Sequence, residues 1–81
     1  MKYEECKTKQ EKAKWFLSHK ISAQLKTFWD EEAKDFIERW VSTIGGRCVS
    51  LNGSEYKFKT REEAIDNGIK YKDMCKTVIS N

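Results

Sequence analysis

The sequence contains no proline, and it has only one histidine, three cysteines and four glycines. Without proline, no residue forces a helix or a strand to end. No stretch approaches the roughly 20 consecutive apolar residues that a membrane-spanning helix needs. The first ten residues, MKYEECKTKQ, also lack the apolar core of a signal peptide. We therefore expect a cytoplasmic protein with no membrane partner.

Cys6, Cys48 and Cys75 are too few and too widely spaced for a secreted disulfide framework, so we expect reduced thiols. The four candidate zinc ligands, in the order Cys6, His19, Cys48 and Cys75, are 13, 29 and 27 positions apart. Structural zinc sites usually have ligands in close pairs. No local Cys–His motif and no glycine-rich phosphate loop is present. We expect no metal, no cofactor and no enzymatic activity.

The chain of 81 residues is 36% charged and 12% aromatic, with a net charge of +3. Disordered chains are poor in aromatic residues, so the aromatic content predicts a single folded domain over residues 1–81, frayed at 1–7. The charge is uneven. Residues 1–26 hold seven Lys and three Glu, whereas residues 27–46 hold two basic and five acidic residues. This small net charge is only weak evidence for nucleic-acid binding.

Helical spacing of apolar residues predicts two helices in the first half of the chain. The first runs from about 9 to about 26, after a capping box, TKQE, at residues 8–11. The second runs from about 30 to 44, between the acidic residues that begin with Asp30 and the Gly45 that follows. Its apolar positions follow the helical period without a gap and are Ala33, Phe36, Ile37, Trp40, Val41 and Ile44.

A β-hairpin and a third helix are predicted in the second half. Asn52-Gly53 is a strong two-residue turn signal, and it sets Val49 opposite Tyr56 and Arg47 opposite Phe58. A second capping box, TREE at 60–63, opens a helix from 61 to about 78. Gly68 either ends a short helix or lies where helix and sheet pack closely. The prediction is a small two-layer α+β domain of order α-α-β-β-α, with its two-stranded hairpin covered by helices.

Trp15 and Phe16 are neighbours, so on a helix their side chains point about 100° apart. Phe16 belongs to the predicted apolar stripe. Trp15 then shares the polar side with basic residues, and a second basic strip is expected on the hairpin. These candidate nucleic-acid-binding residues are Lys9, Lys12, Lys14, Trp15, His19, Lys26, Lys57 and Lys59. Lysines neutralise phosphates and an indole stacks on an unpaired base, so we hypothesise a small non-enzymatic regulatory protein that binds nucleic acid, with RNA preferred.

Other interpretations stay open. A lysine-rich helix face is also typical of ordinary solvated surface. Lys57 and Lys59 are also typical of charged residues that protect an edge strand from aggregation. Trp15 is either part of the core, a nucleic-acid contact or a protein contact. Burial beneath residues 1–7 would remove the main argument for nucleic acid.

The alternative function is an inhibitor or adaptor, for example phage-encoded, that binds a larger host enzyme with or without RNA bridging. Its docking face would be acidic, formed by Glu31, Asp35 and Glu38. The sequence leaves the oligomeric state open.

Overall fold

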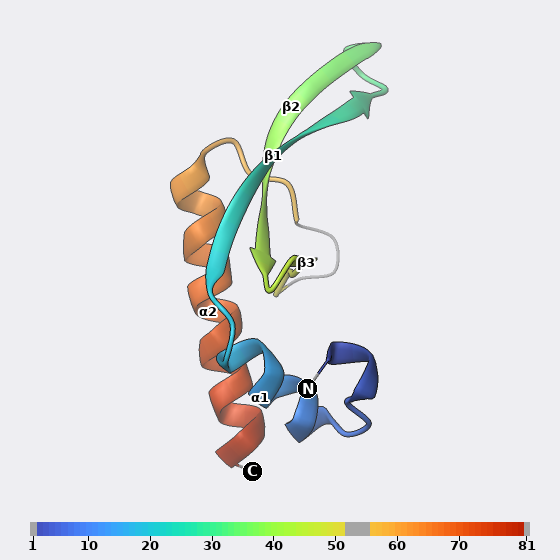
Figure 1. Ribbon diagram of the computed structural model, residues 1–81. Coiled ribbons are helices and arrows are strands. Elements are labelled where there is room, and N and C mark those ends of the chain that lie inside the picture. The colour runs from blue at the N-terminus through green and yellow to red at the C-terminus, as the bar shows by residue number, and fades with distance from the viewer. Residues whose placement is uncertain (1, 52–55, 81) are drawn as a thin grey trace.

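The computed structural model describes residues 2–51 and 56–80, which form an α+β domain (Figure 1). A three-stranded antiparallel sheet of order β1-β2-β3 is combined with two α-helices and one short 3-10 helix. The elements, in chain order, are η1 (Tyr3–Glu5), α1 (Lys9–Leu17), β1 (Ile21–Asp30), β2 (Asp35–Ile44), β3 (Arg47–Cys48) and α2 (Arg61–Ser80). The α+β class is thus confirmed, whereas the predicted order of elements is not.

The long hairpin of β1 and β2 replaces two predicted helical segments. The two strands pair over their full length, from Ile21 opposite Ile44 to Asp30 opposite Asp35. The predicted extension of the first helix to residue 26 is therefore wrong, and so is the predicted helix over 30–44. The second segment contains many β-branched and aromatic residues, which favour strands, and this preference prevails over the helical spacing of its apolar positions. Residues 18–26 contain one β-branched residue, Ile21, and residues 21–26 form a strand by pairing with β2.

The acidic stretch after β1 forms a turn instead of a helix start. The Asp30 carboxylate accepts a hydrogen bond from the backbone N–H of Glu32 at 3.0 Å, which is the local bond typical of an Asx turn. Lys34 then adopts a left-handed backbone conformation, with φ of 52°. Gly45 and Gly46, with φ of 60° and 84°, form the next two-residue loop, because Ile44 pairs with Arg47 across them.

Segments from both halves of the predicted hairpin lie along β2. Arg47 pairs with Ile44, the Val49 N–H donates to the Ser42 carbonyl at 3.0 Å, and Phe58 forms a bridge with Trp40. The predicted pairing of Arg47 with Phe58 is therefore wrong. The turn predicted at Asn52-Gly53 lies outside the described residues.

The two capping predictions are confirmed. The Thr8 hydroxyl accepts the N–H of Glu11 at 3.1 Å at the start of α1, and Thr60 accepts the N–H of Glu63 at 3.2 Å at the start of α2. The first helix ends at Leu17, where the Ser18 hydroxyl donates to the carbonyl oxygen of Trp15 at 2.7 Å. This side-chain bond competes with continuation of the helix.

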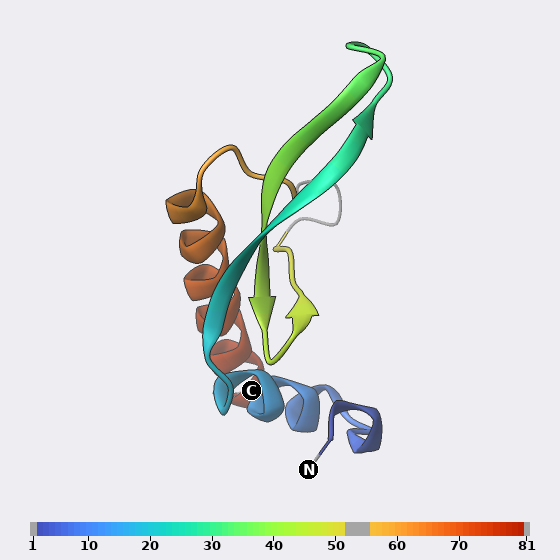
Figure 2. The same ribbon diagram turned by 45° about the horizontal axis from the view of Figure 1, so that its top comes forward.

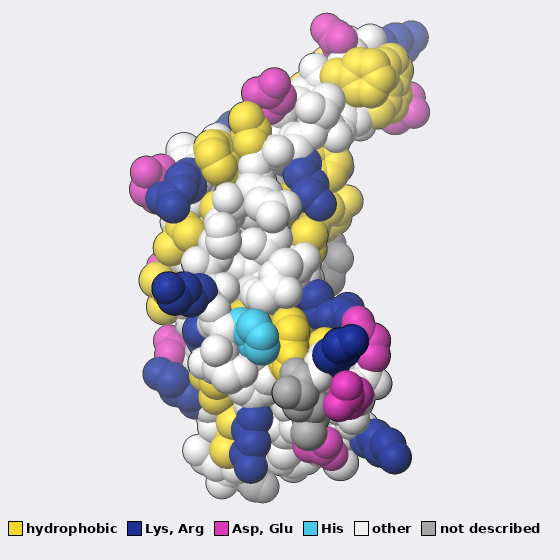
Figure 3. Space-filling view, viewed as in Figure 1, with side chains coloured by type: hydrophobic (Ala, Val, Ile, Leu, Met, Phe, Trp, Pro, Cys, Tyr) yellow, Lys and Arg dark blue, Asp and Glu magenta, His cyan; other side chains and the backbone are white. Residues whose placement is uncertain are grey.

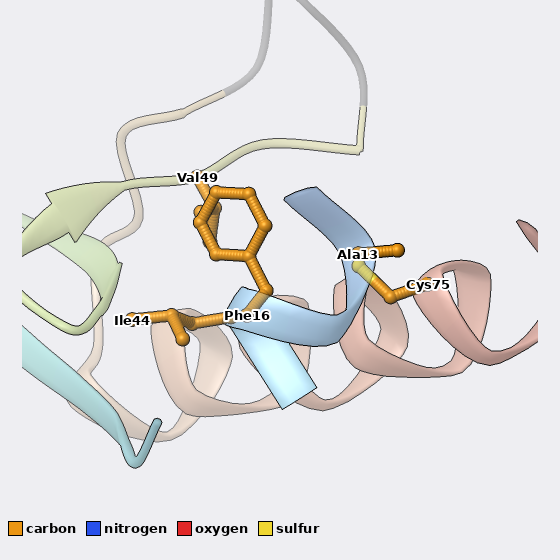
Figure 4. Close-up of a cluster of buried hydrophobic side chains, with 5 residues drawn as sticks. All are labelled: Ala13, Phe16, Ile44, Val49 and Cys75. Carbon is orange, nitrogen blue, oxygen red and sulfur yellow. The ribbon is translucent and has the colours of Figure 1, made fainter. Parts of the chain in front are cut away.

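α2 covers one face of the sheet. A Cβ atom on Gly68 would lie 2.6 Å from Ile21 Cγ2, so glycine is what permits the close packing of α2 on β1. The buried Asn67 amide donates to the Ser42 hydroxyl at 2.8 Å and to the Val49 carbonyl at 3.1 Å. Between α1, α2 and the sheet lies the buried cluster drawn in Figure 4, formed by Ala13, Phe16, Ile44, Val49 and Cys75.

The outer part of the hairpin, residues 25–39, is called the arm here. It extends beyond both helices in the two views of Figures 1 and 2. The domain measures 43 × 22 × 20 Å with a radius of gyration of 14.0 Å, whereas a compact chain of this length has a radius of about 12 Å. No helix in the described part of the chain is long and apolar enough to cross a membrane.

Candidate nucleic-acid interface

Trp15 is half-buried and packs against the core. Its ring centroid lies 5.3 Å from that of Tyr3 and 5.2 Å from that of Phe16, in edge-on geometry. On its other side His19 stacks at 4.0 Å, and the imidazole Nδ1 lies 2.7 Å from the Trp15 carbonyl oxygen. The predicted solvent-facing orientation of Trp15 is therefore wrong, because Tyr3 in the N-terminal segment packs against it. The Trp15 indole on α1 is therefore packed against other rings and does not offer the solvent-facing surface expected for base stacking.

The predicted basic residues do not form one helical face. Lys9, Lys12 and Lys14 are exposed on α1, but Lys26 lies on β1. Lys12 approaches the Tyr3 ring at 5.9 Å. Lys57 and Lys59 flank Phe58, the residue that bridges to β2. Lys26 and Lys57 thus belong to the sheet side of the molecule, away from α1.

The sheet face opposite α2 carries three cations, Lys26, Arg39 and Lys57, which we call the basic face. Directly paired residues of an antiparallel sheet share a face, and Lys26 is paired with Arg39. Neither shares a face with Ile21 or Ser42, which α2 contacts. Nearer the base, Val41 and Thr43 on this face are buried, so its accessible part is the arm.

Lys57 connects the basic face to two aromatic rings. Its ammonium lies 4.4 Å from the centre of the Phe28 ring and 5.4 Å from that of Tyr56. The two rings are 6.1 Å apart in edge-on geometry. Phe28 lies on the same face as Lys26, and Tyr56 is exposed. Sequence reasoning missed Arg39, Phe28 and Tyr56; the available signal was the alternation of residues along 21–30.

Like charges directly opposite one another destabilise a sheet. The pairing of Lys26 with Arg39 therefore carries an energetic penalty, and neither cation forms an ion pair among the described residues. The Arg39 guanidinium donates to the neighbouring Glu38 carbonyl at 2.8 Å, and the Lys26 ammonium lies 3.8 Å from the Cys48 sulfur. An anionic ligand would relieve this repulsion.

A hollow of about 530 Å³ opens beside Trp15, next to the Gly45-Gly46 loop and the N-terminal segment. Its cations are Lys2 and Arg47, but Arg47 forms an ion pair with Glu4 and stacks on Tyr3 at 3.9 Å. Because the carboxylate already neutralises the guanidinium, the hollow is a poorer phosphate site than the basic face.

The acidic residues of the alternative hypothesis are dispersed. Glu31 lies in the turn at the tip of the arm, Asp35 begins β2, and Glu38 points to the opposite face from Asp35. The Asp35 carboxylate accepts the N–H of Phe36 at 2.7 Å. The predicted acidic helix face is therefore wrong, since its residues form a hairpin tip and strand.

None of the three cysteines forms a disulfide bond, and Cys6 and Cys75 are buried. Burial raises the pKa of the Cys75 thiol, so this group is a less reactive core residue at neutral pH. Across residues 2–51 and 56–80, no group of three or more His, Cys, Asp or Glu side chains is arranged to hold a metal ion. Comparisons with protein-family models, curated proteins and solved structures find no match.

Proposed function

We propose that this protein is a small non-enzymatic regulatory protein that binds single-stranded nucleic acid, RNA in preference to DNA, through the basic face. The observation that supports this most directly is the direct pairing of Lys26 with Arg39, with Lys57 over the Phe28 ring. Cations beside accessible aromatic rings suit a flexible single strand, because phosphates pair with the cations and unpaired bases stack on the rings. This surface takes the place of the α1 face that the sequence predicted.

The proposal is tested by the salt dependence of RNA binding. Fluorescence anisotropy of a labelled uridine-rich RNA is measured from about 50 to about 200 mM salt. The double variant Lys26→Ala/Arg39→Ala should reduce the slope of log affinity against log salt by roughly 1.4, at about 0.7 per phosphate contact on a single strand. Tyr56→Ala should weaken binding about tenfold, through loss of one stacked base.

A matched control removes the same charge elsewhere. Lys70 and Lys76 are exposed on α2 and are paired with Asp66 and Asp73. Lys70→Ala/Lys76→Ala should leave the salt slope unchanged. Equal losses in the two double variants would show that only net charge matters and would contradict a site on the basic face. A DNA oligonucleotide of the same sequence measures the preference for RNA.

A further inference from the structure

The outer edge of β1 is unprotected. β1 pairs with β2 along one edge over ten residues, and no other strand in the described part of the chain pairs with it. Between Ile21 and Trp29 the strand has one charged residue, Lys26, and no proline. Charged residues, prolines and bulges are the usual protection of an edge against pairing with another strand.

The arm also exposes a set of large apolar side chains on the face that α2 occupies nearer the base. Leu25, Trp29 and Phe36 share that face and are 48%, 49% and 65% exposed. Trp29 and Phe36 contact one another edge-on at 5.2 Å, so they form one patch. Figure 3 shows hydrophobic side chains gathered at the far end of the hairpin, with acidic side chains beside them. We call Leu25, Trp29 and Phe36 the apolar arm face.

We propose that the protein forms a symmetric dimer in which the free edges of two β1 strands pair antiparallel. The two sheets then become one continuous six-stranded sheet, related by a two-fold axis perpendicular to it. The occupant of the free edge is thus a second copy of this chain. This inference goes beyond nucleic-acid binding and does not depend on it.

Side-chain alternation and charge select the register. Side chains alternate between the two faces of a strand, and residues opposite each other must share a face. An odd-numbered residue of one β1 must therefore lie opposite an odd-numbered residue of the other, and an even-numbered residue opposite an even-numbered one. With Leu25 opposite the partner's Leu25, Lys26 faces the partner's Gln24. In the next allowed register, which is centred on residue 26, Lys26 would lie opposite the partner's Lys26, where like charges repel. The register centred on Leu25 avoids this repulsion.

The same register provides complementary contacts at both ends of the strand. Lys20, which is exposed just before β1, lies opposite the partner's Asp30. Ile21 lies opposite the partner's Trp29, on the face where α2 packs. α2 packs on Ile21 through Gly68, and the next residue, Ile69, is an apolar side chain that is 48% exposed. The acidic arm tip of each copy therefore meets a lysine at the base of the other.

Sedimentation equilibrium of the protein without nucleic acid tests the dimer. We expect a species of twice the 9.6 kDa chain mass. Leu25→Lys sets two ammonium groups against each other at the axis and should raise the dimer dissociation constant at least tenfold. Leu51→Lys, at an apolar residue 43% exposed outside β1, is the matched control and should leave it unchanged. Circular dichroism of each variant confirms the fold.

A charge exchange tests the register. Lys20 and Asp30 lie at opposite ends of one strand, about 30 Å apart within a chain, so they attract one another only between copies. Lys20→Glu and Asp30→Lys should each weaken the dimer, and the double variant should restore it. A monomer at all concentrations contradicts the proposal, as does a dimer insensitive to Leu25→Lys or one that the exchange does not restore.

Discussion

At the scale of single residues, glycine determines where the elements approach each other. Gly45 has a φ of 60°, and a Cβ atom there would lie 2.5 Å from Trp15 Cη2 and 3.0 Å from the His19 ring. The next residue, Gly46, has a φ of 84°, but a Cβ atom there would meet no atom within 4 Å. The pair therefore separates the cost of backbone strain from the cost of a steric clash.

Gly45→Ala and Gly46→Ala should both destabilise the domain, because a side chain is disfavoured at positive φ. Gly45→Ala should lower the free energy of unfolding by about 2 kcal/mol more than Gly46→Ala, since overpacking costs about 1–3 kcal/mol. Urea denaturation measures both values. Equal losses would show that Trp15 moves freely away from the loop, contrary to its packing between Tyr3, Phe16 and His19.

At the scale of elements, local signals were predictable and the choice between helix and strand was not. The Thr8 and Thr60 caps depend on residues three apart, so the sequence predicts both, together with α2. The stretch from Asp35 to Ile44 has helical spacing of its apolar residues but β-branched and aromatic composition. Its strand conformation is decided by pairing with β1, which lies in another part of the sequence.

The same choice between helix and strand explains why the basic face was not predicted from the sequence. Placing residues 21–30 on a strand sets Lys26 beside Arg39 and Phe28, which a helical assignment separates. Trp15 could not be placed from its helix alone, because the Tyr3 ring that packs on it belongs to the N-terminal segment. The lysines were predictable as candidates, but their grouping required the strand register.

Arg39→Glu tests the balance between stability and binding in the arm. Replacing the like-charge pair with an opposite-charge pair should raise the free energy of unfolding by about 0.5 kcal/mol, or the melting temperature by about 3 °C. The same change should weaken salt-dependent RNA binding about as much as Lys26→Ala/Arg39→Ala does, because both lower the charge of the basic face by two. Calorimetry and anisotropy on one preparation measure both effects. A variant that loses stability and retains affinity would contradict the role of Arg39.

At the scale of the whole molecule, the arm separates two surfaces. Lys26, Arg39 and Lys57 lie on one face, and Leu25, Trp29 and Phe36 lie on the other. The tip of the arm, residues 30–35, carries four acidic residues and one lysine, which gives it a net charge of −3. Because the whole chain has a net charge of +3, the rest of the chain has a net charge of +6. In the proposed dimer both basic faces lie on the same side of the joined sheet, which extends the surface available to a nucleic-acid strand.

The central claim is that the basic face binds the strand, and nuclear magnetic resonance titration tests it most directly. Isotope-labelled protein is titrated with unlabelled uridine-rich RNA, and backbone and side-chain shifts are followed residue by residue. We expect the largest changes to fall on Lys26, Phe28, Arg39, Tyr56 and Lys57, while α2 signals change little. Changes confined to Lys9, Lys12 and Lys14 on α1, or no changes at low salt, would contradict it.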